Sequence, residues 1–159
     1  MSFLSREEFK QASTHFRQVV ELSPEDERGW INLSLVHLRQ EDYDASIKVI
    51  RNGLEINPEN PEFWFYLGYA HSEQEKYEEA IEITEQAVKQ FEKHHRLHFL
   101  LGQSYDQAGQ FEKAVATFET ALDINPDDIY TLNYLGYILA DRCLRLDEAK
   151  DMIEKALGQ

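Results

Sequence analysis

Apolar and polar residues follow each other along this chain in a pattern that repeats every 34 residues. The clearest marker of the period is a leucine that recurs at Leu33, Leu67, Leu101 and Leu135. Within each period, apolar side chains recur at the three- and four-residue spacing of an amphipathic helix, in two stretches separated by short polar turns. Each period therefore predicts a hairpin of two helices. No stretch alternates with the period of two that predicts a strand.

Small residues and prolines keep the same step. Glycine recurs at Gly68, Gly102 and Gly136, and a second small-residue position recurs at Ala12, Ser46, Ala80 and Ala114. Small side chains at a helix crossing let the two helices approach closely, so we expect both positions to face the partner helix of the hairpin. A proline that interrupts helices recurs at Pro24, Pro58 and Pro126. These prolines predict where one hairpin ends and the next begins.

This spacing resembles the tetratricopeptide repeat (TPR), whose pattern is W-x2-L-G-x2-Y...A-x3-F...P. Two successive periods carry the likeness, in the residues Trp64, Leu67, Gly68 and Ala80, then Leu101, Gly102, Tyr105, Ala114, Phe118 and Pro126. The resemblance covers nearly the whole chain. It implies an all-α fold of tandem antiparallel helical hairpins in a right-handed superhelix, an α-solenoid. The last repeat, over residues 132–157, looks like those of bacterial TPR proteins of the cell envelope.

We predict a single TPR domain over residues 1–159, with an unpaired helix at 5–22 and repeats at 27–60, 61–94, 95–128 and 129–159. Ser5 followed by Glu8 predicts a capping box, and Asn60 before Pro61 predicts an N-cap with proline at the first helical position. The last repeat has one extra residue, which we place in the turn around 142–145. The junction at 91–95 differs from the others because it lacks the proline.

Three histidines replace aromatic residues of the pattern. His37 and His71 stand where Tyr105 stands, and His98 stands where the two earlier periods have Trp30 and Trp64. All of these positions are predicted to face the inside of a hairpin. The replacements therefore put titratable rings at packing positions.

Charge excludes two classes of partner. The chain has 30 acidic and 16 basic side chains, a net charge of -14. Nucleic-acid binding draws affinity from clustered Lys and Arg, so we predict no nucleic-acid partner. The longest apolar run, residues 63–70, is far shorter than the ~20 residues that cross a bilayer, so we predict no direct membrane insertion.

Motifs that carry catalytic chemistry are not found in the sequence. There is no glycine-rich phosphate loop, no G-x-S-x-G, no H-E-x-x-H and no C-x-x-C. The best metal candidate is the group of His94, His95 and His98, but His98 holds a packing position and no carboxylate at ligand spacing completes the set. The single cysteine, Cys143, fits a small residue in a loop. We therefore predict no enzyme activity, no metal site and no cofactor.

The outward face of each first helix is more apolar than a face turned to water should be. In the TPR family this face lines the concave groove that receives extended or helical peptides. The resemblance therefore implies a partner-binding surface for a protein or peptide, formed by Ile31, Leu35, Phe65, Tyr69, Phe99, Gln103, Tyr130, Asn133 and Tyr137. Tyr66 and Tyr134 fit ligand contact and contact between adjacent first helices equally well.

Two other functions stay open at this point. A solenoid needs polar caps at its ends, so ends without caps predict a self-assembling scaffold, a homo-oligomer joined through the solenoid ends. The chain also fits the recognition fragment of a larger multidomain protein. Residues 1–10 lack the apolar stretch of a secretory signal, which predicts a cytoplasmic protein. A trimmed chain would instead fit a periplasmic or envelope-anchored parent.

Overall fold

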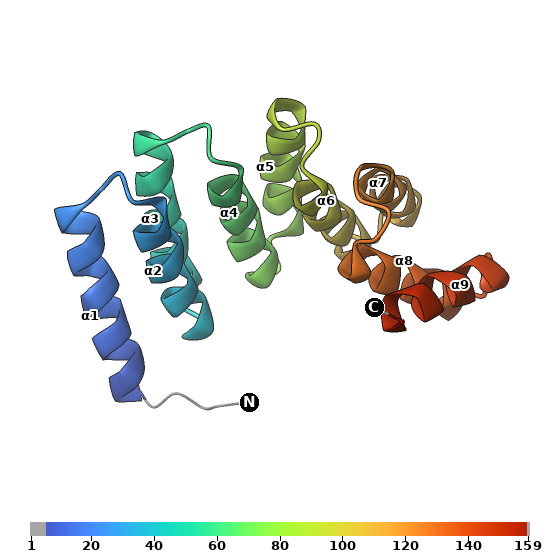
Figure 1. The fold of residues 1–159 in the computed structure, drawn as a ribbon, viewed down its shortest axis with the longest axis horizontal. Helices are drawn as coiled ribbons and strands as arrows, with labels where there is room; N and C mark the ends of the chain where they lie inside the picture. The colour runs from blue at the N-terminus through green and yellow to red at the C-terminus, as the bar shows by residue number, and fades with distance from the viewer. Residues whose placement is uncertain (1–5, 159) are drawn as a thin grey trace. The chain divides into compact units, whose positions relative to one another are not determined.

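The computed structural model describes residues 6–158, and over that part of the chain it consists of helices joined by turns (Figure 1). Its nine helices confirm the all-α class predicted from the 34-residue period. They are α1 (Arg6–Leu22), α2 (Glu27–Arg39), α3 (Tyr43–Ile56), α4 (Pro61–Glu73), α5 (Tyr77–Gln90), α6 (His95–Gln107), α7 (Phe111–Ile124), α8 (Ile129–Asp141) and α9 (Leu146–Leu157). The predicted capping box depends on Ser5, which lies outside the described residues.

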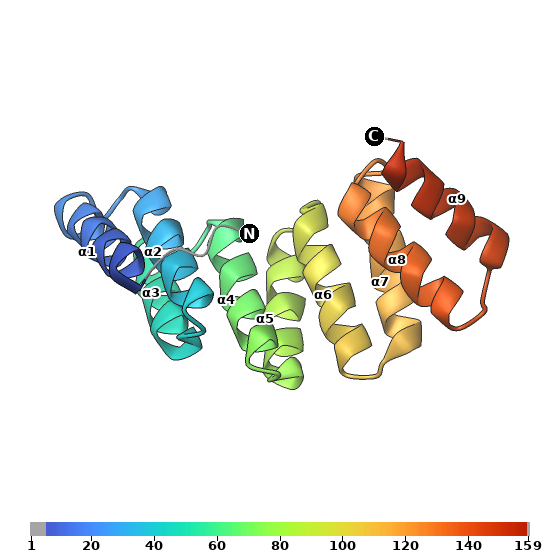
Figure 2. The ribbon, with the colours of Figure 1, turned by 90° about the horizontal axis from the view of Figure 1, so that it is seen from below.

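Contacts within the chain divide it into two compact units, and each is described by itself. Unit 1 is Met1–Ala87 and unit 2 is Val88–Gln159. In unit 1, α1 packs on α2, and α3 packs on both α2 and α4. In unit 2, α6 pairs with α7 and α8 pairs with α9, each pair joined by a short turn (Figure 2). The division falls close to the junction at 91–95 that lacks a proline.

Helix starts follow from local side-chain chemistry. Asn60 caps α4, since its side chain accepts a hydrogen bond from the Glu62 N–H at 2.9 Å and Pro61 occupies the first turn, as the sequence predicts. Asp26 and Asp128 cap α2 and α8 in the same way. Each acceptor satisfies an N–H that the first turn of a helix leaves unpaired. The starts of α2, α4 and α8 are thereby fixed by single residues.

The core of unit 1 lies between α3 and α4. Ile50, Phe63 and Leu67 are its buried centre, and Trp30 and Ile83 are among the partly buried residues packed against it. The ring of Phe63 lies directly on α3, where a Cβ added to Gly53 would stand 3.0 Å from the Phe63 Cζ. Glycine is therefore needed at position 53 for the close approach of α3 and α4.

The turn inside each hairpin is the same, except in the last one. Turns 40–42, 74–76 and 108–110 have three residues, whereas the last turn, 142–145, has four. The extra residue is therefore where the sequence predicts it. In each turn a backbone N–H donates to a carbonyl five residues earlier, at 2.8–3.0 Å, in the pairs Asp42 to His37, Lys76 to His71, Gln110 to Tyr105 and Leu144 to Leu139.

The glycine position of the pattern lies at the hairpin crossings, as expected. In unit 2, Gly102 lies under the buried ring of Phe118, and an added Cβ would stand 2.8 Å from the Phe118 Cε1. In unit 1 the glycine position is taken by Ser34, whose buried hydroxyl makes a 2.7 Å hydrogen bond to the hydroxyl of Ser46. Both solutions keep the helices close.

Candidate functional site

The predicted binding face has a rigid support, because the first helix of three successive hairpins is tied to the turn before it. The indole N–H of Trp30 donates to the Pro24 carbonyl at 2.8 Å, and that of Trp64 donates to the Pro58 carbonyl at 2.9 Å. His98 makes the same contact in unit 2, with its Nε2 2.9 Å from the Glu92 carbonyl oxygen. A carbonyl oxygen only accepts, so Nε2 carries the proton.

In unit 1 the predicted face is a cluster of rings on α4. Phe65 and Tyr69 are stacked with centroids 6.2 Å apart, and Tyr66 meets Phe65 edge-on at 5.3 Å. Phe65 and Tyr69 are half-buried, and Tyr66 packs against the unit 1 core. Burial, together with the nearby Glu73 carboxylate, raises the pKa of Tyr69 to about 12. Its hydroxyl is therefore neutral at physiological pH and can act as a hydrogen-bond donor.

The other two unit 1 predictions lie on α2. Ile31 packs against the same core as Tyr66, and Leu35 is half-buried. Both residues therefore keep part of their side chain accessible and part in contact with neighbours. The structure brings Ile31 close to the ring cluster of α4 through this shared core.

In unit 2 the most exposed rings are on α8. Tyr130 is 70% exposed and Tyr137 is 63% exposed, and the Asn133 side chain between them is exposed as well. Residues 130, 133 and 137 follow the i, i+3, i+7 spacing of one helix face. The opposite face of α8 is buried through Thr131, Leu132, Leu135, Gly136, Ile138 and Leu139. Two accessible tyrosines thus stand on a helix that is fixed from behind.

Phe99 is engaged inside unit 2 more than its sequence position indicates. Its ring lies 5.8 Å from the buried Phe118 and 6.0 Å from Tyr134, centroid to centroid. The Tyr134 hydroxyl donates to Asp106 Oδ2 at 3.2 Å, and burial together with Asp106 raises the pKa of Tyr134 to about 12. Tyr134 therefore makes contacts between adjacent helices, one of the two roles left open for it. Gln103, on the same helix as Phe99, is half-buried.

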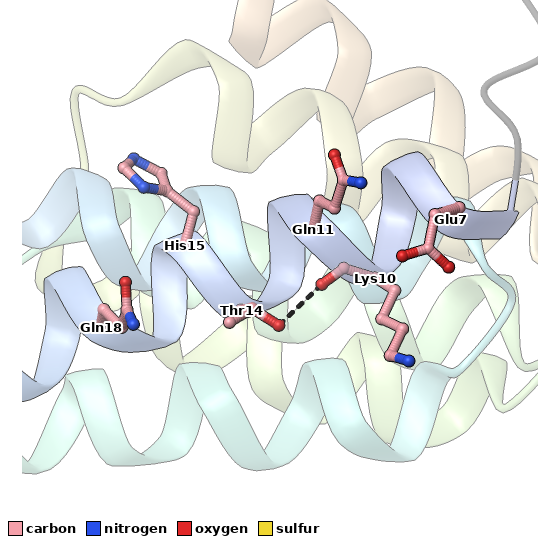
Figure 3. Close-up of a pocket in the computed structure, with 6 residues that line it drawn as sticks. All are labelled: Glu7, Lys10, Gln11, Thr14, His15 and Gln18. Atoms are coloured by element: carbon pink, nitrogen blue, oxygen red, sulfur yellow. Dashed lines mark hydrogen bonds between the residues drawn. The ribbon is translucent and has the colours of Figure 1, made fainter.

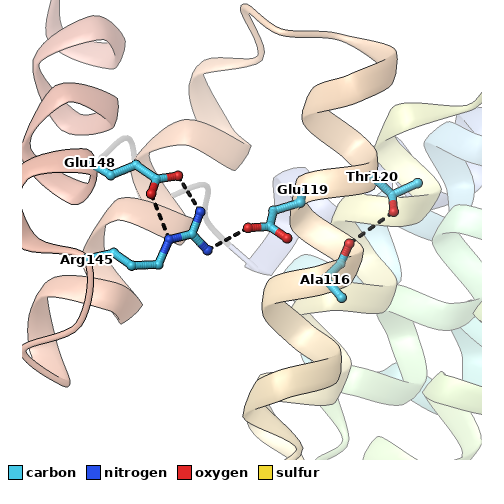
Figure 4. Close-up of polar contacts among 5 residues, drawn as sticks. All are labelled: Ala116, Glu119, Thr120, Arg145 and Glu148. Atoms are coloured by element: carbon cyan, nitrogen blue, oxygen red, sulfur yellow. Dashed lines mark hydrogen bonds and ion pairs between the residues drawn. The ribbon is translucent and has the colours of Figure 1, made fainter.

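Some positions that shape the site are not evident from the repeat pattern. Arg145 binds Glu148 on the helix that it precedes and Glu119 of α7 at 2.6 Å, which holds the start of α9 (Figure 4). The only sequence feature that marks this position is the extra residue in the 142–145 turn. The sequence places Asp106 on the same predicted face, but no such feature marks its hydrogen bond to Tyr134, because the bond depends on how α6 and α8 pack.

Surface depressions elsewhere on the molecule are lined by ordinary polar and apolar side chains. One of about 280 Å³ lies along α1 alone and is lined by polar side chains such as Lys10, Gln11 and His15, while the Thr14 hydroxyl donates to the Lys10 carbonyl of the same helix at 2.9 Å (Figure 3). A second, of about 400 Å³, has Val20, Trp30 and Leu33 among its lining. No group of three potential metal ligands occurs among the described residues. None of the helices in the described part of the chain has the length and apolarity to span a membrane.

Comparison with known proteins agrees with this geometry. Sequence models of the tetratricopeptide repeat match residues 1–61, 33–85 and 71–132. A thermophilic TPR protein of Thermus thermophilus matches with 21% identity and a TM-score of 0.81, over 96% of this chain and 84% of that one. MamA of Desulfovibrio magneticus RS-1 matches with 20% identity and a TM-score of 0.72, over 96% and 86%. YrrB, described as a TPR protein with an unusual peptide-binding site, matches with 20% identity and a TM-score of 0.65, over 96% and 78%. No curated protein matches.

Proposed function

Since the chain belongs to the tetratricopeptide-repeat family, whose members are protein-interaction modules, we propose that it binds a segment of a partner protein through the outward faces of its first helices. In this proposal α8 of unit 2 and α4 of unit 1 each offer such a face. Catalysis plays no part in the proposal, because TPR proteins generally act as non-catalytic interaction scaffolds.

The observation that carries the proposal is the exposure of Tyr130 and Tyr137 on one face of α8. A tyrosine ring has a large apolar surface and few rotatable bonds, so ordering it on binding costs little entropy. Such rings are enriched among the residues that dominate binding energy at protein interfaces. Asn133 between them offers both a donor and an acceptor to a peptide backbone.

The charge of the chain suggests which segments bind. With a net charge of -14, the protein attracts neutral or basic segments more than acidic ones. Complementary charge mainly accelerates encounter, so added salt should slow association more than it speeds dissociation.

A peptide-display selection against the full chain, followed by affinity measurement on one selected peptide, tests the proposal. The double variant Tyr130→Ala, Tyr137→Ala should weaken binding by about 2 kcal/mol or more, roughly thirtyfold, because it removes both exposed rings. Its melting temperature should change little, since the lost rings face solvent. The double variant Tyr69→Ala, Phe99→Ala is a weaker test. Phe99 packs on the buried Phe118, so a loss of binding in that variant could come from a loss of stability.

The matched control is Leu22→Ala with Leu157→Ala, two strongly exposed apolar side chains that lie outside the predicted face. This control should bind the selected peptide as the native chain does. Equal affinity of the tyrosine variant and the control, or a selection without any enriched sequence, would contradict the proposal. Self-association through the helix ends stays a separate prediction, which sedimentation over a range of concentrations addresses.

A further inference from the structure

His71 is a titratable ring enclosed by unit 1. The residue is only 9% exposed, and neither Nδ1 nor Nε2 has a hydrogen-bond partner among the residues that the structure describes. Compared with water, this buried position deprives a neutral imidazole of the hydrogen bonds of one donor and one acceptor. An imidazolium loses far more, since both N–H groups and a full charge are then buried without an acceptor.

The charged groups around His71 do not compensate for this burial. Burial lowers the pKa of His71 below its usual range, and the nearby Arg51 and Lys76 lower it further, against the opposite effect of Glu79 and Asp44. The Asp44 carboxylate is already engaged, because Oδ1 accepts a hydrogen bond from Gln74 Nε2 at 2.8 Å. The surroundings of His71 therefore favour the neutral ring.

His37 repeats the situation one period earlier in unit 1. It is partly buried between α2 and its neighbours, and it shares a depression with Arg17, Glu21 and Lys48. Asp42 lies at the turn, with Oδ2 3.7 Å from His37 Nδ1. Burial lowers the pKa of His37, and the effect of Asp42, which raises it, does not reverse the direction.

Unit 2 has no titratable ring of this kind at the same position. Tyr105 and Leu139 stand there, and their carbonyls accept a backbone hydrogen bond from five residues further on, as those of His37 and His71 do. Tyrosine ordinarily titrates near pH 10 and leucine does not titrate. Unit 2 therefore presents no buried imidazole at this position of the repeat.

From these contacts we propose that unit 1 contains an acid-sensitive pair, His37 and His71, whose protonation destabilises unit 1. The direction follows from proton linkage. An unfolded histidine binds its proton near pH 6.5, so a folded histidine with a lowered pKa binds fewer protons than the unfolded one below that pH. The stability of unit 1 is therefore complete above about pH 6.5 and falls as the pH drops from there. Most carboxylates stay charged down to about pH 5, so a change in stability between pH 6.5 and 5 arises mainly from the protonation of histidines.

The sequence supplies a reporter for unit 1. The chain has two tryptophans, Trp30 and Trp64, and both lie in unit 1. Tryptophan emission therefore follows unit 1, whereas far-ultraviolet circular dichroism follows the helices of both units. Thermal unfolding of the full chain at pH 7.5 and pH 5.5, recorded by both signals, tests the proposal directly.

For the native chain we expect the midpoint by tryptophan emission to fall by about 4 °C or more between these pH values, with a smaller fall by circular dichroism. The variant His37→Gln, His71→Gln, which keeps a polar side chain but cannot titrate there, should lose this pH shift. Each variant is compared with itself at two pH values, so a lower overall stability does not affect the conclusion. His15→Gln, on the exposed side of α1, is the matched control and should keep the native shift.

Two results would overturn the proposal. One is a tryptophan midpoint that falls equally in the native chain and in the double variant. The other is a pKa for His71 above 6.5 in a nuclear magnetic resonance titration of the folded native chain. The single variant His71→Gln replaces the double variant if the latter does not fold.

Discussion

The α2–α3 hairpin of unit 1 and the α6–α7 hairpin of unit 2 fill the same positions of the 34-residue pattern with different chemistry. In unit 1 the crossing is polar, with the Ser34 and Ser46 hydroxyls hydrogen-bonded at 2.7 Å. In unit 2 the equivalent positions hold Gly102 and the buried Ala114, and the Phe118 ring covers Gly102, so the crossing is apolar. The comparison indicates that the pattern fixes the volume available at a crossing. It allows either an apolar contact or a polar pair such as Ser34 and Ser46, in which each hydroxyl satisfies the other.

The turns of the two hairpins likewise keep the same backbone conformation with different residues. Gly109 has a φ of 75° in the α6–α7 turn, and glycine adopts this left-handed region without strain. Glu41 in the α2–α3 turn and Glu75 in the α4–α5 turn both have a φ of 59°. A left-handed conformation costs a residue with a Cβ roughly 1–2 kcal/mol. The turns of unit 1 therefore carry strain that the α6–α7 turn avoids.

The apolar crossing should be the easiest to break. Gly102→Ala places a Cβ 2.8 Å from the fully buried Phe118 ring, which must shift to make room. We expect a net loss of about 2 kcal/mol, since overpacking costs typically 1–3 kcal/mol and alanine returns only part of this through its helix propensity. Urea unfolding followed by circular dichroism measures it. Gly158→Ala is the control, because a Cβ there meets only the carbonyl oxygens of Glu154 and Lys155, at the ordinary contact distances of 3.4 and 3.8 Å. An unchanged midpoint for Gly102→Ala would mean that the helices can separate at the crossing.

The polar crossing should respond to single changes more than to a paired one. Ser46→Ala leaves the buried Ser34 hydroxyl without its side-chain partner and should lower the free energy of unfolding by about 1 kcal/mol. Adding Ser34→Ala should restore most of that loss, because the unpaired hydroxyl is then gone. The two single variants, the double variant and the native chain form a thermodynamic cycle. Additive effects in this cycle would show that the two hydroxyls are not coupled.

The smallest effect concerns the turns. Glu75→Gly should stabilise the chain by about 0.5 kcal/mol, since relief of the left-handed strain exceeds the entropy that glycine loses on folding. Gly109→Ala should act in the opposite direction at the equivalent turn of unit 2. Melting temperatures of both variants provide the test, and a shift of the same sign in both would contradict the account.

The repeat pattern predicts much of this fold and less of the site. It predicts the hairpins, the Asn60 cap and the place of the extra residue, because each depends on local spacing or on a single side chain. It does not predict the contact of Phe99 with Phe118, because equivalent positions on the first helices look alike until the packing of their neighbours is known. The Ser34–Ser46 bond could have been predicted, since Ser34 lies one period before Gly68. The preference of His71 for its neutral form could not be predicted, because it depends on which charged side chains lie around the ring.

The bond from each first helix to the preceding turn has a mechanical consequence. Trp30, Trp64 and His98 each tie a hairpin to a carbonyl six residues earlier, at a constant step of 34 residues. Under tension along the chain, these ties are the points at which one repeat is released from the next. Each release frees about 34 residues, or a contour length of roughly 110–120 Å when fully extended. The protein would therefore lengthen under force in regular increments set by the spacing of three ring N–H groups.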